Sequence, residues 1–243
     1  MKKSLYSRLK ERLNITENGI VGFWDLVTKV LSYVSLLVIV LAIKKRWNVY
    51  KGKEDRIDSI YSLVEIWVIA HVFLAILISA ITFYCFTPDN LILLYVLSTY
   101  GSIRVFEIII KQIRVIMFDT IGEKAVELKS ARRSIILLLH NVVEMIFWFS
   151  VSLMLVCLLE VNMLDESFIH LSEVFYWSDF IKCSTLQFTT FGDNYTAISG
   201  LIGNQNLLLI NITFWEILVG FIIIVISLAR FFSLLPPVKT LNS

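Results

Sequence analysis

The sequence is poor in charged residues, and this shortage is the first clue to its class. Only 17% of the 243 residues are Asp, Glu, Lys or Arg, whereas soluble domains carry about 25%. Hydrophobic residues make up 57% of the chain. The net charge of +2 gives no reason to expect a nucleic-acid partner. The composition therefore predicts an integral membrane protein whose surroundings are the lipid bilayer.

Residues that link domains or bind metals are also scarce. The chain has 9 Gly and 3 Pro, so no flexible linker divides it and we expect one membrane domain. The three cysteines, Cys85, Cys157 and Cys183, lie too far apart for a metal-ligand motif. We expect them as buried thiols, with a Cys85–Cys157 bridge as the less favoured alternative. No cofactor is predicted.

The apolar runs predict an all-α fold with about five transmembrane helices. A hydrocarbon core about 30 Å thick needs about 20 helical residues to cross it. The expected spans are 24–43, 60–83, 91–118, 134–159 and 207–232. The first is barely long enough, and it either spans or lies partly in the interface. Basic loops at 44–58 and 119–133 are expected in the cytoplasm, which places 160–205 outside and the C-terminus inside the cell membrane.

Ionisable residues at membrane depth are candidates for gating because they are costly there. Arg104, Glu107, Lys111 and Arg114 follow one another at steps of three and four, so they share one helical face. The mixed signs favour an ion-pair or docking face over a voltage sensor, and Glu107 with Lys111 is the expected local pair. By depth, Arg104 is also the expected partner of Glu144 in the next span.

Other intramembrane polar groups have weaker signals. For Glu65, His71 and Glu216 we expect hydrogen-bonded packing rather than a proton relay. His140 and Asn141 are expected beside Glu144. Gly220, midway along the last span, is either a hinge or a point of close helix packing.

Between the last two spans lies an apolar and aromatic stretch that is too short to cross the membrane. Residues 171–191 predict a half-helix that begins at Ser172 and Glu173 and runs inward to about Gln187. Its negative end would favour a cation at the membrane centre. Small and hydroxylated residues follow it, in the sequence Thr189-Thr190-Phe191-Gly192-Asp193. Backbone carbonyls and Thr hydroxyls can replace the hydration shell of an ion.

This arrangement of span, half-helix, Thr-Thr-X-Gly-Asp and span resembles the pore module of the potassium-channel superfamily, whose filter typically reads T-x-T-T-V-G-Y-G-D. Residues 184–193, STLQFTTFGD, match its opening at Thr189, Thr190 and Gly192 but lack two residues. The shortened form is similar to the pores of cyclic-nucleotide-gated channels (S-T-L-T-L-T-T-I-G-E) and of bacterial non-selective cation channels (T-V-G-D-G). The resemblance covers residues 134–233.

The resemblance implies a homotetramer that conducts K⁺ and Na⁺ with weak discrimination, through a filter of Thr189, Thr190, Phe191, Gly192 and Asp193. No metal is expected beyond the permeating cations. The chain then divides into a basic, amphipathic segment (1–23), accessory helices with cytoplasmic loops (24–133), a pore module (134–235) and a short cytoplasmic tail (236–243). That tail is too short for a ligand-binding module, so membrane tension, pH, a lipid or a separate partner protein is the expected gating stimulus.

Two other classes compete with a channel. An intramembrane aspartyl protease needs Gly-X-Gly-Asp and a second intramembrane Asp, but Thr190 replaces the first Gly and no second Asp lies in the middle of a span. No HExxH or Gly-X-Ser-X-Gly motif is present either, so no enzyme is predicted. A non-conducting subunit that assembles with or anchors another membrane protein stays an open alternative.

Overall fold

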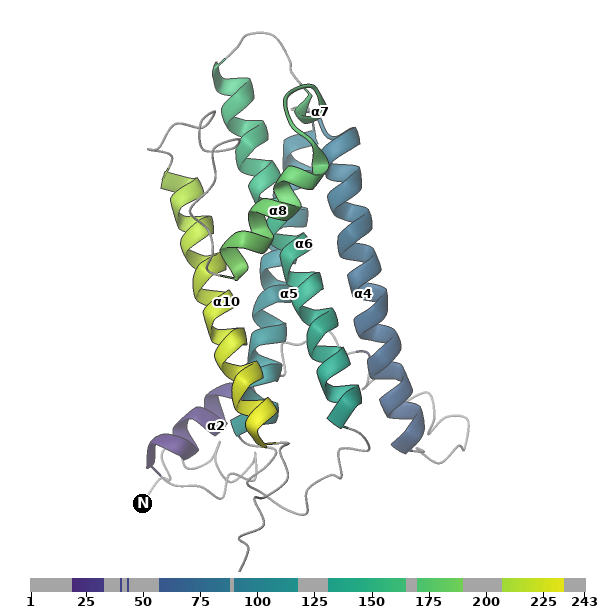
Figure 1. Cartoon of the computed structure of the whole chain (residues 1–243), viewed down its shortest axis with the longest axis vertical. Helices are drawn as coiled ribbons and strands as arrows, with labels where there is room; N and C mark the ends of the chain where they lie inside the picture. Colours follow the sequence, from purple (N-terminus) through teal and green to yellow (C-terminus); the bar gives the residue numbers. More distant parts are fainter. Residues whose placement is uncertain are drawn as a thin grey trace, which may run out of the picture. The chain divides into compact units, whose positions relative to one another are not determined.

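Nearly all of the part of the chain that the structure describes is helical. This computed structural model describes residues 19–32, 40, 43, 57–87, 90–117, 131–164, 170–189 and 207–233. The helices are α2 (Gly19–Ser32), α4 (Ile57–Cys85), α5 (Leu91–Met117), α6 (Ala131–Leu164), α7 (Leu171–Val174), α8 (Trp177–Phe188) and α10 (Leu207–Ser233) (Figure 1). No strand occurs in these ranges.

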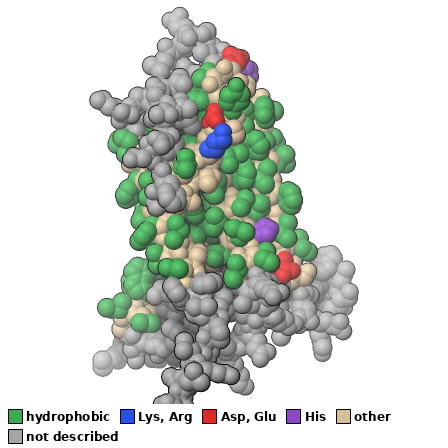
Figure 2. Space-filling model, in the orientation of Figure 1, with side chains coloured by type: hydrophobic (Ala, Val, Ile, Leu, Met, Phe, Trp, Pro, Cys, Tyr) green, Lys and Arg blue, Asp and Glu red, His purple; other side chains and the backbone are tan. Residues whose placement is uncertain are grey.

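Four of the helices, α4, α5, α6 and α10, are long and apolar enough to cross a membrane. They confirm the last four expected spans, and their ends lie within about five residues of the expected positions. The described side chains on the face drawn in Figure 2 are mainly hydrophobic, as a surface in contact with lipid requires. The chain is therefore a membrane protein.

Only part of the first apolar run lies within the described residues. Helix α2 has 14 residues and ends at Ser32, so at 1.5 Å per residue it is about 21 Å long. Lys29, which interrupts the apolar pattern, lies 2.8 Å from Asp25 one turn earlier. Of the rest of the expected span at 24–43, only residues 40 and 43 are described.

The chain divides into two compact units. One unit comprises residues 1–70 and 106–126, and the other comprises residues 71–105 and 127–243. The second unit contains the later part of α4, the earlier part of α5, and all of α6, α7, α8 and α10. Its core is the C-terminal half of α6, where every side chain from Val151 to Leu158 is buried.

Small residues set the register of α5 against α6 in this unit. The hydroxyls of Ser98 and Ser152 lie 2.9 Å apart. One turn along, Gly101 faces Trp148 so closely that a Cβ at 101 would lie 2.6 Å from Cε3 of the indole. Because the residue numbers rise on α5 as they fall on α6, the two helices run antiparallel. Small residues allow this close approach, as is usual in membrane helix packing.

The expected half-helix is broken into two pieces, so the prediction of one continuous helix from Ser172 to about Gln187 is wrong. Residues 171–174 form the single turn α7, and α8 begins only at Trp177. Phe175 and Tyr176 between them are extended. The Tyr176 backbone N–H donates to the Asp179 carboxylate at 3.1 Å, which satisfies a donor at the start of α8. Asp179, rather than Glu173, is therefore the acidic residue that stabilises the N-terminal end of the longer helix.

Candidate functional site

Helix α8 is the feature around which the candidate site is built. It has 12 residues and is therefore about 18 Å long, too short to cross a membrane. It lies obliquely between α6 and α10, and its C-terminal end reaches the middle of α10 (Figure 1). The side chains of α8 that are buried are those of Phe180, Cys183, Ser184, Gln187 and Phe188.

The N-terminal half of α8 is attached to α4 and α6. The Trp177 indole N–H donates to the Ser79 hydroxyl at 3.1 Å, close to the end of α4. Phe180 is fully buried and makes an edge-to-face contact with Phe83, with ring centroids 6.0 Å apart. From α6, the Ser150 hydroxyl lies 3.3 Å from the Phe180 carbonyl oxygen. These contacts fix the depth at which α8 begins.

The C-terminal half is attached to α10 by polar side chains. The Ser184 hydroxyl is hydrogen-bonded to the Glu216 carboxyl and lies 2.9 Å from the Ile146 carbonyl oxygen of α6. One turn further on, the Gln187 amide donates to the Thr213 hydroxyl at 3.0 Å. The hydrogen bond from Ser184 agrees with the packing role expected for Glu216.

Gly220 is the point at which α8 ends against α10. A Cβ at this position would lie 2.0 Å from the Phe188 carbonyl oxygen, which is closer than atoms can approach. The contact is with backbone rather than with a side chain that can turn away. Of the two roles considered for Gly220, this geometry supports close packing. Only glycine lets the last turn of α8 rest directly on the α10 backbone.

The first predicted filter residue follows this contact. Thr189 ends α8, with its backbone N–H donating to the Thr185 carbonyl oxygen at 3.1 Å. Its hydroxyl lies 2.8 Å from the same carbonyl oxygen, so it caps the helix. The other predicted filter residues, Thr190, Phe191, Gly192 and Asp193, lie outside the described residues. The described end of α8 carries the negative end of the helix dipole, which favours a cation.

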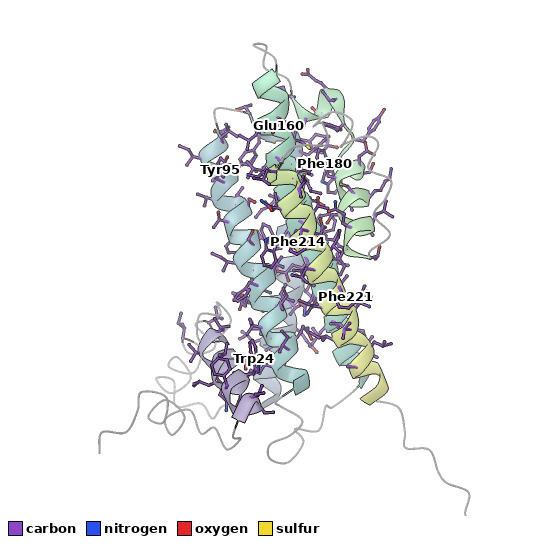
Figure 3. The ribbon with its side chains drawn as sticks, turned by 90° about the vertical axis from the view of Figure 1, so that its left-hand side faces the viewer. Trp24, Tyr95, Glu160, Phe180, Phe214 and Phe221 are labelled. Carbon is purple, nitrogen blue, oxygen red and sulfur yellow. The ribbon has the colours of Figure 1, made fainter. Side chains whose placement is uncertain are left out.

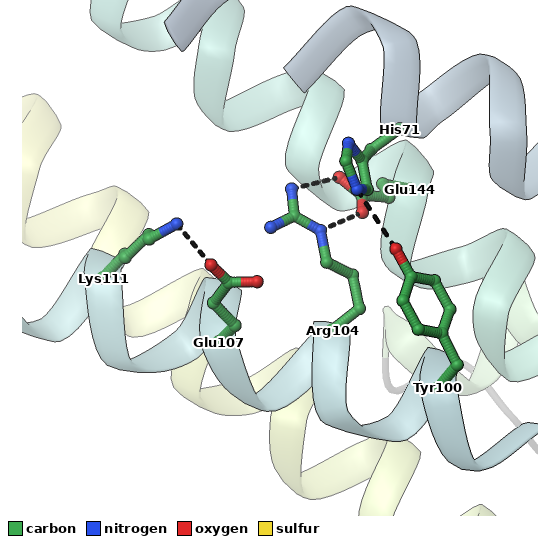
Figure 4. Close-up of polar contacts among 6 residues, drawn as sticks. All are labelled: His71, Tyr100, Arg104, Glu107, Lys111 and Glu144. Carbon is green, nitrogen blue, oxygen red and sulfur yellow. Dashed lines mark hydrogen bonds and ion pairs between the residues drawn. The ribbon is translucent and has the colours of Figure 1, made fainter. Parts of the chain in front are cut away.

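A buried ion pair joins α5 to α6, as the sequence predicted. Arg104 Nε lies 2.7 Å from Glu144 Oε1, and Nη2 lies 3.3 Å from Oε2 (Figure 4). The two side chains are 2% and 0% exposed. His71 Nε2 lies 3.2 Å from the Tyr100 hydroxyl, one turn before Arg104 on α5. The hydrogen bond supports the packing role expected for His71.

The remaining members of the polar face also agree with ion pairing. Lys111 Nζ lies 2.7 Å from Glu107 Oε1, which confirms the expected local pair (Figure 4). Glu107 is buried, whereas Lys111 and Arg114 are partly exposed. Near Glu144, Asn141 is buried as expected. His140 instead lies 2.8 Å from the Ile136 carbonyl oxygen of its own helix.

The opposite face of α10 is apolar and uncovered. Figure 3 shows Phe214 and Phe221 projecting from the helix, and the two side chains are 59% and 57% exposed. The other exposed large hydrophobic residues of α10 are Leu207, Leu208, Ile210, Trp215, Ile217, Ile224, Val225 and Leu228. The single chain thus buries only the stripe of α10 that contains Glu216, Val219, Gly220 and Ile223.

The residues that join α8 to α10 were largely missed by sequence reasoning. Thr213 belonged to no motif, and Ser184 and Gln187 were noted only as part of the stretch 184–193 and at the expected end of the half-helix. Their only signal was spacing, since Ser184, Gln187 and Phe188 share one face of a helix, as do Thr213, Glu216 and Gly220. Cys157 and Cys183 are buried as expected, but Cys85 is exposed.

Two further results bear on the identity of the site. Within the described ranges, no three His, Cys, Asp or Glu side chains gather in a way that could hold a metal ion. No protein-family model, curated protein or solved structure matches this chain.

Proposed function

We propose that this chain is the pore-forming subunit of a cation channel. The observation that carries the proposal is the placement of α8, a half-length helix enclosed by α6 and α10 whose C-terminal end lies against the middle of α10. A buried helix that stops at mid-depth directs its negative end toward the centre of the membrane. Transporters and channels use such helix ends to favour ions there.

Chain connectivity adds a second argument. Residues 190–206 must join Thr189, beside Gly220, to Leu207 at the start of α10. Leu207 and Gly220 are 13 residues apart on one helix, which corresponds to about 20 Å along its axis. A connection between these two points therefore starts at the level of Gly220 and leads to the N-terminal end of α10. Backbone at that depth is tolerated where it is buried in protein or lines a water-filled path.

The proposed filter is Thr189-Thr190-Phe191-Gly192-Asp193, and the proposed assembly is a homotetramer. One copy of this stretch cannot surround an ion, whereas four copies around one axis can. The uncovered apolar face of α10 supports assembly, because it offers a surface for a second copy. We propose that K⁺ and Na⁺ both pass with weak discrimination, since the shortened filter provides fewer successive dehydrated sites than a longer one.

The remaining features are assigned to support and gating. In this proposal α4 and α5 support a pore module formed by α6, α8 and α10 in the cell membrane, with re-entrant α8 entering from outside and the C-terminus in the cytoplasm. Arg104, Glu107 and Glu144 form structural ion pairs rather than a voltage sensor. Gating then depends on membrane tension, pH, lipid or a separate partner protein.

The test is electrical recording of the purified chain in a planar bilayer. Single-channel steps that Gly192→Pro abolishes, and that Ser102→Ala on the exposed face of α5 leaves intact, would support the pore. Under K⁺/Na⁺ bi-ionic conditions we expect a reversal potential near zero. A value near the K⁺ equilibrium potential would contradict weak selectivity, and a silent bilayer with a monomeric particle would exclude the channel in favour of a non-conducting subunit.

A further inference from the structure

Apolar packing alone does not explain why a carboxyl group occupies position 216. Its side chain is 0% exposed in the middle part of α10. Among the described residues, no basic side chain pairs with it, and Oε2 has no hydrogen-bond partner. A carboxyl group is among the most costly groups to bury within a membrane. A leucine of similar size would fill the same space without that cost.

The contacts of the carboxyl group show which helices it connects. Glu216 Oε1 meets the Ser184 hydroxyl, and that hydroxyl also lies 2.9 Å from the Ile146 carbonyl oxygen. Ser184 therefore stands between α6 and α10, and the carboxyl group completes a connection among three helices. The connection lies one turn before Phe188, where α8 ends.

Two neighbouring contacts also hold the last turn of α8 against α10. Gln187 is tied to Thr213 at 3.0 Å, one turn before Glu216 on α10, and Phe188 rests on Gly220, one turn after it. The last turn of α8 is thus held by α10 at three successive levels. Hydrogen bonds between buried groups are directional, so they fix the rotation and depth of a helix in a way that apolar contacts do not.

We propose that Glu216 is a positioning residue for the ion path. Through Ser184 it fixes the rotation and depth of the last turn of α8, and so sets where Thr189 and the residues after it begin. This inference rests on the proposed channel function for its effect on ions. The positioning itself is a property of α8 and α10, so it can be measured whether or not the chain conducts.

The first experiment measures positioning without any current. Cys183 is buried on α8 directly before Ser184, Cys157 is buried on α6, and Cys85 is exposed on α4. The full chain in lipid bicelles is treated with N-ethylmaleimide, and the labelling rate of each cysteine is followed by mass spectrometry. In the unaltered chain, Cys85 should react fast and the two buried thiols slowly.

The variants separate local loosening from general instability. Glu216→Leu and Ser184→Ala should each raise the labelling rate of Cys183 at least about fivefold, with Cys157 unchanged. Glu216→Gln, whose amide can still bond to Ser184, should cause a smaller increase. Ser227→Ala is the matched control, because the Ser227 hydroxyl donates to the Ile223 carbonyl oxygen of its own helix and, among the described residues, to no other helix. Equal acceleration at Cys157 and Cys183, or none at Cys183, would overturn the proposal.

The second experiment tests the effect on ions. If the chain conducts, Glu216→Leu and Ser184→Ala should shift the Na⁺/K⁺ permeability ratio at least about twofold, whereas Ser227→Ala should not. A changed number of channels with an unchanged permeability ratio would reduce Glu216 to a stability role and overturn the proposal. Accelerated Cys183 labelling in a chain that never conducts would instead contradict the proposed function and leave the positioning of α8 by Glu216 intact.

Discussion

The buried ion pair between Arg104 and Glu144 gives a prediction whose size can be worked out from the structure. The two charged groups are 2% and 0% exposed and make two contacts, at 2.7 and 3.3 Å. At an effective dielectric constant of about 20, charges about 4 Å apart attract by about 4 kcal/mol. Both groups have lost their hydration, so most of this attraction offsets desolvation rather than adding net stability.

Removing one partner is therefore far more damaging than removing both. Arg104→Met leaves Glu144 buried without its cation, and Glu144→Leu leaves the guanidinium without its anion. Each single variant should lose about 3–5 kcal/mol of unfolding free energy. The double variant should lose less than either single variant, because two apolar side chains of similar volume leave no charge to compensate.

The assay is reversible unfolding in mixed micelles, with tryptophan fluorescence as the signal and a double-mutant cycle as the analysis. Lys182→Met is the control, since Lys182 is 70% exposed and lies 3.6 Å from Asp179. Pairs of that kind contribute about 0.2–1 kcal/mol at most. Single variants that each lose less than about 1 kcal/mol, or a double variant that loses the sum of both, would refute the reasoning.

Two further predictions concern the contacts of α8 with α10 and with α4. Gly220→Ala forces a Cβ against the Phe188 carbonyl oxygen, whereas Gly101→Ala meets only the Trp148 side chain, which can shift. Differential scanning calorimetry should therefore show a larger fall in Tm for Gly220→Ala than for Gly101→Ala. An equal fall in Tm for the two variants would contradict this prediction. Trp177→Phe removes the donor to the Ser79 hydroxyl and should cost about 1 kcal/mol in micelle unfolding. Trp177→Phe in a Ser79→Ala background should then cost clearly less, and an undiminished cost would argue against the bond.

The sequence was sufficient for the long helices because their signal is local. Apolar runs of about 20 residues and basic loops place α4, α5, α6 and α10 without any knowledge of contacts. The pair of Arg104 and Glu144 was also predictable, because a costly charge needs a partner and only a few groups lie at its depth.

The break before α8 and the links to α10 were not predictable in the same way. The pattern at Ser172 and Glu173 is an acceptable helix start, but Asp179 stabilises a start five residues later, and local sequence does not say which one wins. Pairing Ser184 with Glu216 requires the register of two helices 32 residues apart in the chain. For Arg104, the depth in the membrane limited the possible partners to a few charged groups. The Ser184 hydroxyl can donate to or accept from many groups, so its partner could not be chosen in this way.

The same ion pair bears on whether α5 moves in response to voltage. Carrying one elementary charge across the whole membrane gains about 2.3 kcal/mol per 100 mV. Separating Arg104 from Glu144 breaks a buried ion pair, which costs about 3–5 kcal/mol. At ordinary membrane potentials the field acting on Arg104 alone is therefore too weak to pull it away from α6. Because Ser98 and Gly101 also contact α6 on the same side of α5, sliding would break those contacts as well, and α5 is better suited to a fixed structural role than to sensing voltage.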